Sequence, residues 1–189
     1  MARTILTTLF AALLIPGSLA AAPVKYLLDH AASTVAFETE FGPDVITGTI
    51  PLDTADLTLD FDSVANCTVA VQLDVTGAEA SFPFAAQALK GPKVLDAAAH
   101  PKMIFKSTSV TASGEGATVA GNLTIRGVTR PVTLGAEIFR QKGSVAGDRT
   151  RLTVRLTGKV NRSDFGATGW SDMVDDEVRI IITARIEAK

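Results

Sequence analysis

The side chains that could take part in acid–base or metal chemistry are few and widely spaced. The chain has two histidines and one cysteine among its 189 residues. His100 follows Asp96 by four residues, which would place both on one face of a helix, but Pro101 comes next and ends any helix there. Such a lone pair is more often a surface feature than a metal or proton-transfer site. His30 follows Asp29 where a strand is expected to end, which favours a turn.

No short catalytic or metal-binding motif accompanies these residues. The sequence contains no HExxH, CxxC, P-loop or GxSxG pattern. The acidic run at residues 175–177 is typical of a solvated turn, since a carboxylate dyad needs facing positions. We therefore expect no catalytic residue, no metal site and no enzymatic activity. A small exported hydrolase or isomerase that uses His100 or the acidic run is the alternative.

Apolar side chains point to a different kind of site. Phe82 and Phe84 flank Pro83, so they cannot both be ordinary strand-interior residues. The apolar set indicates either a core filled by its own side chains or a cavity with a helical or loop lid, the usual form of a lipid site. The candidate lining residues are Phe37, Phe41, Phe82, Phe84, Leu89, Met103, Phe105, Leu123, Ile125, Val132 and Leu134.

Composition and the first residues narrow the class of protein. Hydrophobic residues make up 47% of the chain, charged residues 20%, and the formal net charge is −2, so no cationic field exists to hold nucleic acid. Arg3, an apolar run over residues 5–15 and small residues at 18–20 predict a cleaved signal peptide at residues 1–20. That run is shorter than the ~20 residues of a membrane span. We expect an exported, periplasmic protein with one domain over residues 21–189, and Cys67 as a buried small side chain.

After the leader, a period of two dominates the hydrophobic pattern and predicts strands. One segment departs from it: residues 84–98 are rich in Ala, Leu and Lys and predict one or two short helices, interrupted at Gly91 and Pro92. The predicted strands are Val24–Asp29, Ser33–Phe41, Val45–Leu52, Asp56–Phe61, Cys67–Val75, Lys102–Thr111, Ala117–Arg126, Arg130–Gln141, Arg151–Arg162 and Glu177–Ala188.

Several of these strands have one dry face and one wet face, as antiparallel meanders need. In the stretch GNLTIRGVTRPVTL, two alternating runs meet in a hairpin turn around residues 127–129, with Leu123, Ile125, Val132 and Leu134 facing inward. About ten such runs favour a sandwich or an up-and-down barrel, and a barrel removes exposed edges. The pattern alone does not choose between them, nor between a filled interior and a ligand-holding one.

The same hairpin resembles the signature of the YceI-like family of polyisoprenoid-binding, lipocalin-like periplasmic proteins. Further similar stretches occur in the family's order: YLLDHAASTVAF from Tyr26, HPKMIFKST from His100, VNRSDFG from Val160 and DEVRIIITARIEA from Asp176. The resemblance covers nearly the whole chain after the leader. It implies an all-β fold, a closed antiparallel barrel of about eight strands with a short helical insertion around residues 84–98.

The resemblance also implies non-covalent binding of a long apolar molecule, such as a polyisoprenoid, quinone-like or fatty-acyl chain, and no cofactor apart from such a lipid. The alternative is a periplasmic interaction or stress-related module whose barrel is filled. Many relatives carry Arg-Asp-x-His-Leu where this chain has Ala85–Leu89, so polar groups that would either meet a ligand headgroup or tie the helix to the barrel are absent here. Candidates for a polar mouth are Arg162, Asp164 and Trp170. We expect no nucleic-acid partner, no membrane span, and a monomer or homodimer.

Overall fold

The computed structural model describes residues 22–189, so the predicted signal peptide at residues 1–20 lies outside the described part of the chain. The described chain is mostly β-strand and has one α-helix, α1 (Pro83–Lys90). Its strands are β1 (Val24–Leu28), β2 (Thr34–Phe41), β3 (Asp44–Thr49), β4 (Leu52–Leu59), β5 (Thr68–Asp74), β6 (Glu79–Ala80), β7 (Lys102–Ser113), β8 (Gly116–Ile125), β9 (Val128–Arg140), β10 (Arg151–Asn161) and β11 (Glu177–Ala188).

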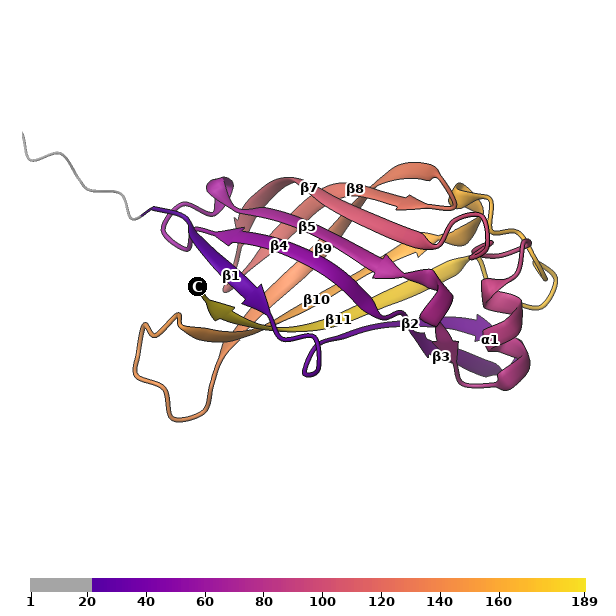
Figure 1. Ribbon diagram of the computed structural model, residues 1–189, viewed down its shortest axis with the longest axis horizontal. Helices are drawn as coiled ribbons and strands as arrows, with labels where there is room; N and C mark the ends of the chain where they lie inside the picture. Colours follow the sequence, from indigo (N-terminus) through magenta and orange to yellow (C-terminus); the bar gives the residue numbers. More distant parts are fainter. Residues whose placement is uncertain (1–21) are drawn as a thin grey trace, which may run out of the picture.

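Eight of these strands close into an antiparallel barrel, which confirms the predicted fold class (Figure 1). The order around the barrel is β1, β4, β5, β7, β8, β9, β10 and β11. The first strand closes the ring, because β1 pairs with β4 through Tyr26 and Leu57 and with β11 through Tyr26 and Ala188. Closure leaves no long exposed edge in this part of the sheet.

Two successive strands share one edge of the long strand β11. β1 pairs with its C-terminal end, where Leu28 faces Ile186, and β2 pairs with its earlier half, where Glu38 faces Arg179. β3 then pairs with β2, and the two-residue strand β6 pairs with β3. These three strands extend the wall of the barrel at the end that α1 covers (Figure 1).

Alternation along the strands separates the interior from the solvent. On β10, Leu152 is buried and Val154 faces the interior, whereas Arg151 and Arg155 are exposed. Arg151 makes an ion pair with Glu187 of β11 at 3.0 Å, between two exposed side chains. An exposed pair of this kind contributes little to stability, so the barrel is held by its strand pairing and its apolar interior.

The helical segment is shorter than the predicted range of residues 84–98. Pro83 occupies the first turn of α1, where its missing N–H costs nothing, and the helix ends at Gly91 because Pro92 follows. The rest of the segment consists of turns, fixed by hydrogen bonds from the amide of Leu95 to the carbonyl of Leu89, 2.9 Å, and from Ala97 to Lys90, 3.0 Å. Leu95 and Ala97 are buried in the core at this end.

The turn between β8 and β9 is a two-residue hairpin at Arg126 and Gly127, both with positive φ of 52° and 74°. Such angles match the twist of a tight hairpin and favour glycine at the second position. The side chain of Arg126 reaches back toward the segment after α1, where its Nη1 donates a 2.8 Å hydrogen bond to the carbonyl of Val94. The turn therefore ties the wall of the barrel to the segment that follows α1.

Candidate functional site: an apolar cavity inside the barrel

The barrel encloses a cavity of about 960 Å³. It runs through the interior between the buried clusters at the two ends, which are built around Phe165 at the α1 end and Tyr26 at the other. It reaches the surface at the α1 end, because Phe82, Phe84 and Trp170 both line it and are exposed. The cavity is therefore an apolar space with a mouth beside α1.

All eleven apolar residues that the sequence analysis selected line this cavity; their binding of a ligand stays a prediction. They come from several parts of the wall. β2 supplies one group, the hairpin of β8 and β9 supplies another, and the residues at α1 lie at the mouth. The lining includes Phe37 and Phe41, Phe82, Phe84 and Leu89, Met103 and Phe105, Leu123 and Ile125, Val132 and Leu134.

Glycines in the wall make room for two of these aromatic rings. A Cβ atom at Gly121 would lie 2.5 Å from Cζ of Phe105 and 2.6 Å from the carbonyl oxygen of Lys106. A Cβ atom at Gly48 would likewise meet the ring of Phe37. Glycine within a strand often marks such a close approach. The rings of Phe105 and Phe37 thus pack directly against these two glycines. A larger residue in place of either glycine would push the ring toward the lumen.

Replacement of Gly121 by alanine is expected to destabilise the protein by about 1–3 kcal/mol, the usual cost of overpacking. The matched control is Gly135→Ala in β9, where the nearest atoms to a new Cβ lie at 3.9 Å. The control should change the free energy of unfolding by less than about 0.5 kcal/mol. Urea denaturation followed by circular dichroism measures both, and equal stabilities of the two variants would contradict the close approach.

Arg162 holds the loop that forms one side of the mouth, residues 166–176, called the mouth loop below. β10 ends at Asn161, and Arg162 begins a short 3-10 helix, Arg162–Phe165. Its side chain is only 9% exposed and lines the cavity. All three guanidinium nitrogens donate to backbone carbonyls: Nε to Asp175 (2.9 Å), Nη1 to Ala167 (2.8 Å) and Gly169 (2.7 Å), and Nη2 to Val174 (2.9 Å).

The other two residues predicted for a polar mouth lie apart from each other. Trp170 sits in the mouth loop and lines the cavity, and Nζ of Lys93 lies 5.9 Å from its ring centroid. Asp164 is exposed and lies outside the cavity lining. Asp164 and Arg162 do not lie on a strand, because the chain leaves β10 at Asn161 and turns into the 3-10 helix.

Polar groups are scarce in the described lining. Arg162 is the one charged residue among the lining residues of the described chain, and Thr39, Gln87 and Trp170 supply most of the remaining polar groups. Thr39 is engaged with the end of the mouth loop and the start of β11, since its Oγ1 donates to the carbonyls of Asp175 (3.3 Å) and Glu177 (3.0 Å). Gln87 lies on an exposed position of α1 at the mouth.

The groups with clearly shifted pKa values lie away from the cavity. Burial raises the pKa of the Tyr26 hydroxyl, and a hydrogen bond from Asn66 lowers the pKa of Asp60. Hydrogen bonds from Thr76 and Thr150 lower the pKa values of Asp74 and Asp148. None of these four residues lines the cavity. Within residues 22–189, no group of three or more His, Cys, Asp or Glu residues is arranged to hold a metal ion.

The sequence analysis missed part of the lining. Val154 and Leu156 of β10 and Ile182 of β11 also face the cavity. Their alternating pattern predicted a buried face but not that this face borders a cavity. Met173 in the mouth loop carried no signal in the sequence, because its position depends on the hydrogen bond from the amide of Gly42 to its carbonyl, 3.2 Å.

Comparisons with known proteins agree with this architecture. Residues 26–186 match the YceI-like domain. Protein YceI from Salmonella agona (strain SL483) is 29% identical over 185 residues, covering 97% of this chain and 96% of the relative. Protein YceI from Salmonella arizonae is also 29% identical, over 177 residues that cover 93% of this chain and 92% of the relative.

Two crystal structures share the fold. Burkholderia cenocepacia BcnA superposes with a TM-score of 0.74 at 21% identity, covering 84% of this chain and 98% of BcnA. The Campylobacter jejuni YCEI protein superposes with a TM-score of 0.58 at 20% identity, covering 99% of this chain and 94% of that protein. Together with the match over most of its length, this similarity shows that the chain belongs to the YceI-like family.

Proposed function

We propose that this protein binds and carries one long apolar molecule inside its barrel, without catalysis. The observation that carries the proposal is the cavity of about 960 Å³ with its almost wholly apolar lining. Burial of hydrocarbon in such a space is favourable by roughly 25 cal/mol per Å² of apolar surface. The YceI-like family is known as a barrel fold that binds polyisoprenoid-type ligands, which supports the same function.

The size of the cavity is sufficient for a long lipid chain. A liquid-like group the size of a water molecule occupies roughly 30 Å³, and a methylene group is of similar size. A cavity of about 960 Å³ thus has room for roughly 30 such groups. A single polyisoprenoid, quinone-like or fatty-acyl chain fits this capacity. The alternative, an interaction module with a filled barrel, requires an interior without such a space.

The lining favours a ligand with an uncharged head. Each nitrogen of the Arg162 guanidinium already donates to a backbone carbonyl of the mouth loop. A phosphate or carboxylate in the cavity would lack a free cation there, and a buried unpaired charge is costly. Gln87 at the mouth can donate to or accept from a hydroxyl or carbonyl. The charged head of a longer lipid would have to remain outside, in solvent.

Export to the periplasm belongs to the same proposal. The pattern of residues 1–20 is that of a secretory signal, and the chain is similar to Protein YceI of Salmonella over nearly its whole length. No helix among the residues described by the structure is long and apolar enough to cross a membrane. An exported carrier of this kind would move an apolar molecule through an aqueous compartment.

A titration with two matched probes tests the proposal. Protein stripped of lipid on a hydrophobic resin is mixed with the isoprenoid alcohol geranylgeraniol or with its diphosphate, and bound ligand is counted after gel filtration. The alcohol is expected to bind at about one molecule per barrel, and the diphosphate at least about tenfold more weakly. No binding of either probe favours the filled-barrel module, and tighter binding of the diphosphate contradicts the uncharged-head assignment.

A further inference from the structure

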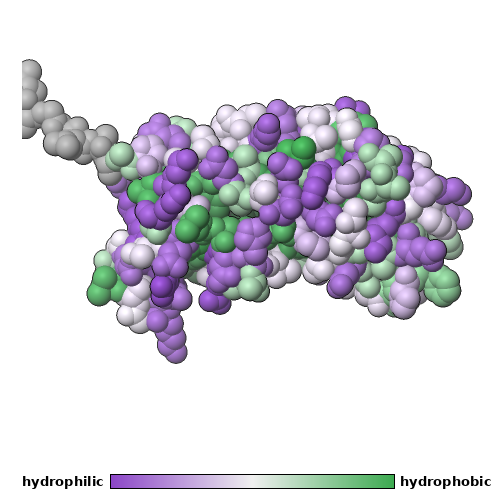
Figure 2. Space-filling view, viewed as in Figure 1, coloured by the Kyte–Doolittle hydropathy of each residue, from purple (hydrophilic) through white to green (hydrophobic). Residues whose placement is uncertain are grey.

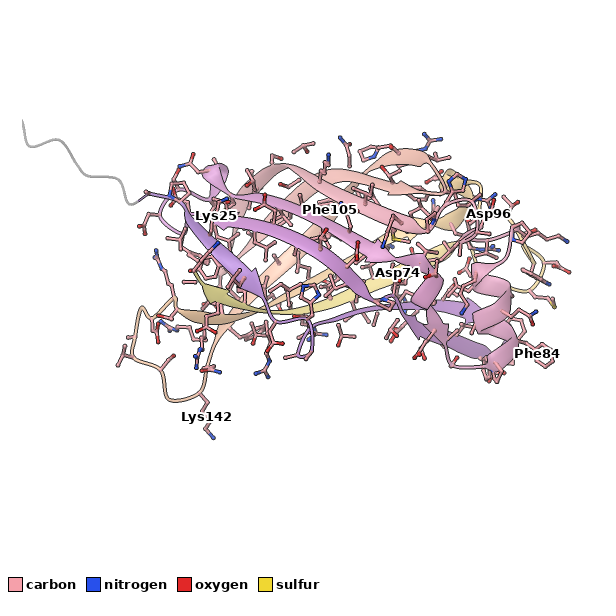
Figure 3. All side chains as sticks on the ribbon, viewed as in Figure 1. Lys25, Asp74, Phe84, Asp96, Phe105 and Lys142 are labelled. Carbon is pink, nitrogen blue, oxygen red and sulfur yellow. The ribbon has the colours of Figure 1, made fainter. Side chains whose placement is uncertain are left out.

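The α1 end of the barrel carries a cluster of exposed, large apolar side chains. Phe84, on the first turn of α1, is 85% exposed and points away from the barrel (Figure 3). Figure 2 shows hydrophobic residues at the surface of this end of the molecule. These side chains, called the portal patch below, are Phe82 (43% exposed), Phe84, Trp170 (40%) and Met173 (48%) around the mouth, and Val45 (49%) on the outer face of β3, where its neighbour Ile46 faces the cavity.

Three structural segments meet at this patch. α1 follows β6, which pairs with β3, and the amide of Ser81 donates a 2.7 Å hydrogen bond to the carbonyl of Thr47. The start of α1 therefore lies beside β3, which carries Val45. Phe41, at the end of β2, forms a bridge with Val174 of the mouth loop. The strands β2 and β3 thus place α1 and the mouth loop on the same end of the barrel.

The portal patch is continuous with the cavity. Phe82, Trp170 and Met173 line the cavity as well as being exposed, and Phe84 lies at the outer rim of its mouth. A molecule that enters or leaves the cavity at this end passes across these side chains. An apolar surface of this extent at a cavity mouth marks an interaction site.

The mouth loop holds the backbone of Trp170 in a strained conformation at the cavity mouth. Trp170 has a positive φ of 54°, which is unfavourable for a bulky residue. Its carbonyl accepts hydrogen bonds from the amides of Met173 (3.0 Å) and Val174 (2.9 Å). Next to it, the carbonyl of Gly169 accepts from Arg162 at 2.7 Å. The surrounding bonds impose this strain, which is typical of functional positions.

Charged residues of both signs lie around the portal patch, which limits the kind of partner. Glu40, opposite Val45 on β2, pairs with Arg179 at 3.5 Å. Lys90 and Lys93 lie on the helical side, and Asp44 and Asp172 lie beside Val45 and Met173. Attraction to a strongly charged surface is therefore absent, and contact depends on the apolar side chains. Exposed Phe and Trp residues that project from a surface suit the boundary between lipid headgroups and acyl chains, where aromatic rings are favoured.

We propose that the portal patch docks on the surface of a lipid bilayer, so that an apolar ligand passes between membrane and barrel without crossing water. This inference rests on the proposed carrier function. The patch inserts shallowly, with Phe84 and Trp170 in the headgroup region, and the contact does not need anionic lipid. Docking is reversible, because a few buried side chains give only weak membrane affinity.

Trp170 is the one tryptophan of the chain, so its fluorescence reports the contact directly. The protein is titrated with phosphatidylcholine vesicles at 0.1 M and 0.5 M salt, with and without brominated acyl chains. We expect a blue shift of the emission, quenching by brominated lipid, and the same partition coefficient at both salt concentrations. Phe84→Asp and Val45→Asp should each lower the partition coefficient at least about tenfold, because a charge replaces an inserted side chain.

Val145→Asp is the matched control, since Val145 is 75% exposed in the loop between β9 and β10, at the other end of the barrel (Figure 1). It should leave vesicle binding unchanged. Val45 lies outside the cavity lining, so Val45→Asp should also bind geranylgeraniol in solution as the wild type does. Loss of vesicle binding with intact alcohol binding in this variant therefore separates docking from carriage.

Three results would overturn the docking proposal. The first is the absence of vesicle binding by a wild type that binds geranylgeraniol, which removes docking and leaves carriage intact. The second is a loss of vesicle binding in Val145→Asp as large as that in Phe84→Asp and Val45→Asp. The third is concentration-dependent dimerisation that Phe84→Asp and Val45→Asp abolish without any vesicle binding, which assigns the patch to a second copy of the chain. Failure of geranylgeraniol binding in the wild type is a failure of the proposed function itself.

Discussion

Replacement of Arg162 by methionine is expected to lower the free energy of unfolding by about 3–5 kcal/mol, as when one partner of a buried ionic network is removed. The guanidinium satisfies four backbone carbonyls of the mouth loop from a position that is 9% exposed. Methionine fills similar space but donates no hydrogen bond, so these carbonyls lose their donors. Urea denaturation at neutral pH measures the loss.

The control is Arg155→Met, on the outer face of β10, where the side chain is exposed. It should alter stability by no more than about 0.5 kcal/mol. Arg162→Lys should be nearly as damaging as methionine, because an ammonium group is compact and cannot reach four carbonyls in a fixed fan. A loss below about 1 kcal/mol in Arg162→Met would contradict the structural role. An unchanged Trp170 emission maximum would show that the mouth loop does not depend on Arg162.

Replacement of Val154 by tryptophan is expected to lower the affinity for geranylgeraniol at least about tenfold while the fold persists. Val154 lies on β10 and lines the cavity. The lumen of an eight-stranded barrel is only wide enough for side chains or one slender ligand, so a single indole obstructs it. Because the new ring enters an existing space, stability should stay within about 1 kcal/mol or rise.

Thr153→Trp is the matched control, because Thr153 points to the opposite face of β10 and does not line the cavity. It should bind the alcohol like the wild type. Gel-filtration binding and thermal melting are measured on both variants. If Val154→Trp binds as tightly as the wild type, the ligand does not occupy the lumen.

Strand patterning predicted most of the wall, since one buried and one wet face is a property of each strand alone. The inward positions Leu123, Ile125, Val132 and Leu134 follow from alternation around one turn and all line the cavity. The pattern could not predict how the strands close into a barrel. β1 and β2 share the edge of β11, which depends on pairing between the two ends of the chain. β6 has only two residues, too few for a periodic signal.

The mouth was less predictable than the wall because it is built from irregular backbone. Arg162 was expected near a ligand, but its side chain is engaged with carbonyls between residues 167 and 175, a pairing that no local pattern indicates. Asp164 lies beyond the end of β10, in the 3-10 helix, where strand alternation no longer predicts the direction of a side chain. The sequence likewise does not predict a cavity, since the pattern around Val154 would be the same if side chains filled the interior.

Mass spectrometry of an organic extract shows whether the barrel carries a lipid when the protein is made in cells. Wild type and Val154→Trp are expressed with the leader, purified from the periplasm without detergent, and extracted side by side. We expect one long-chain, mainly hydrocarbon molecule at near-stoichiometric yield from the wild type and a several-fold lower yield from Val154→Trp. Absence of any such molecule from the wild type across several expression hosts, or equal yields from both proteins, would contradict carriage in the barrel.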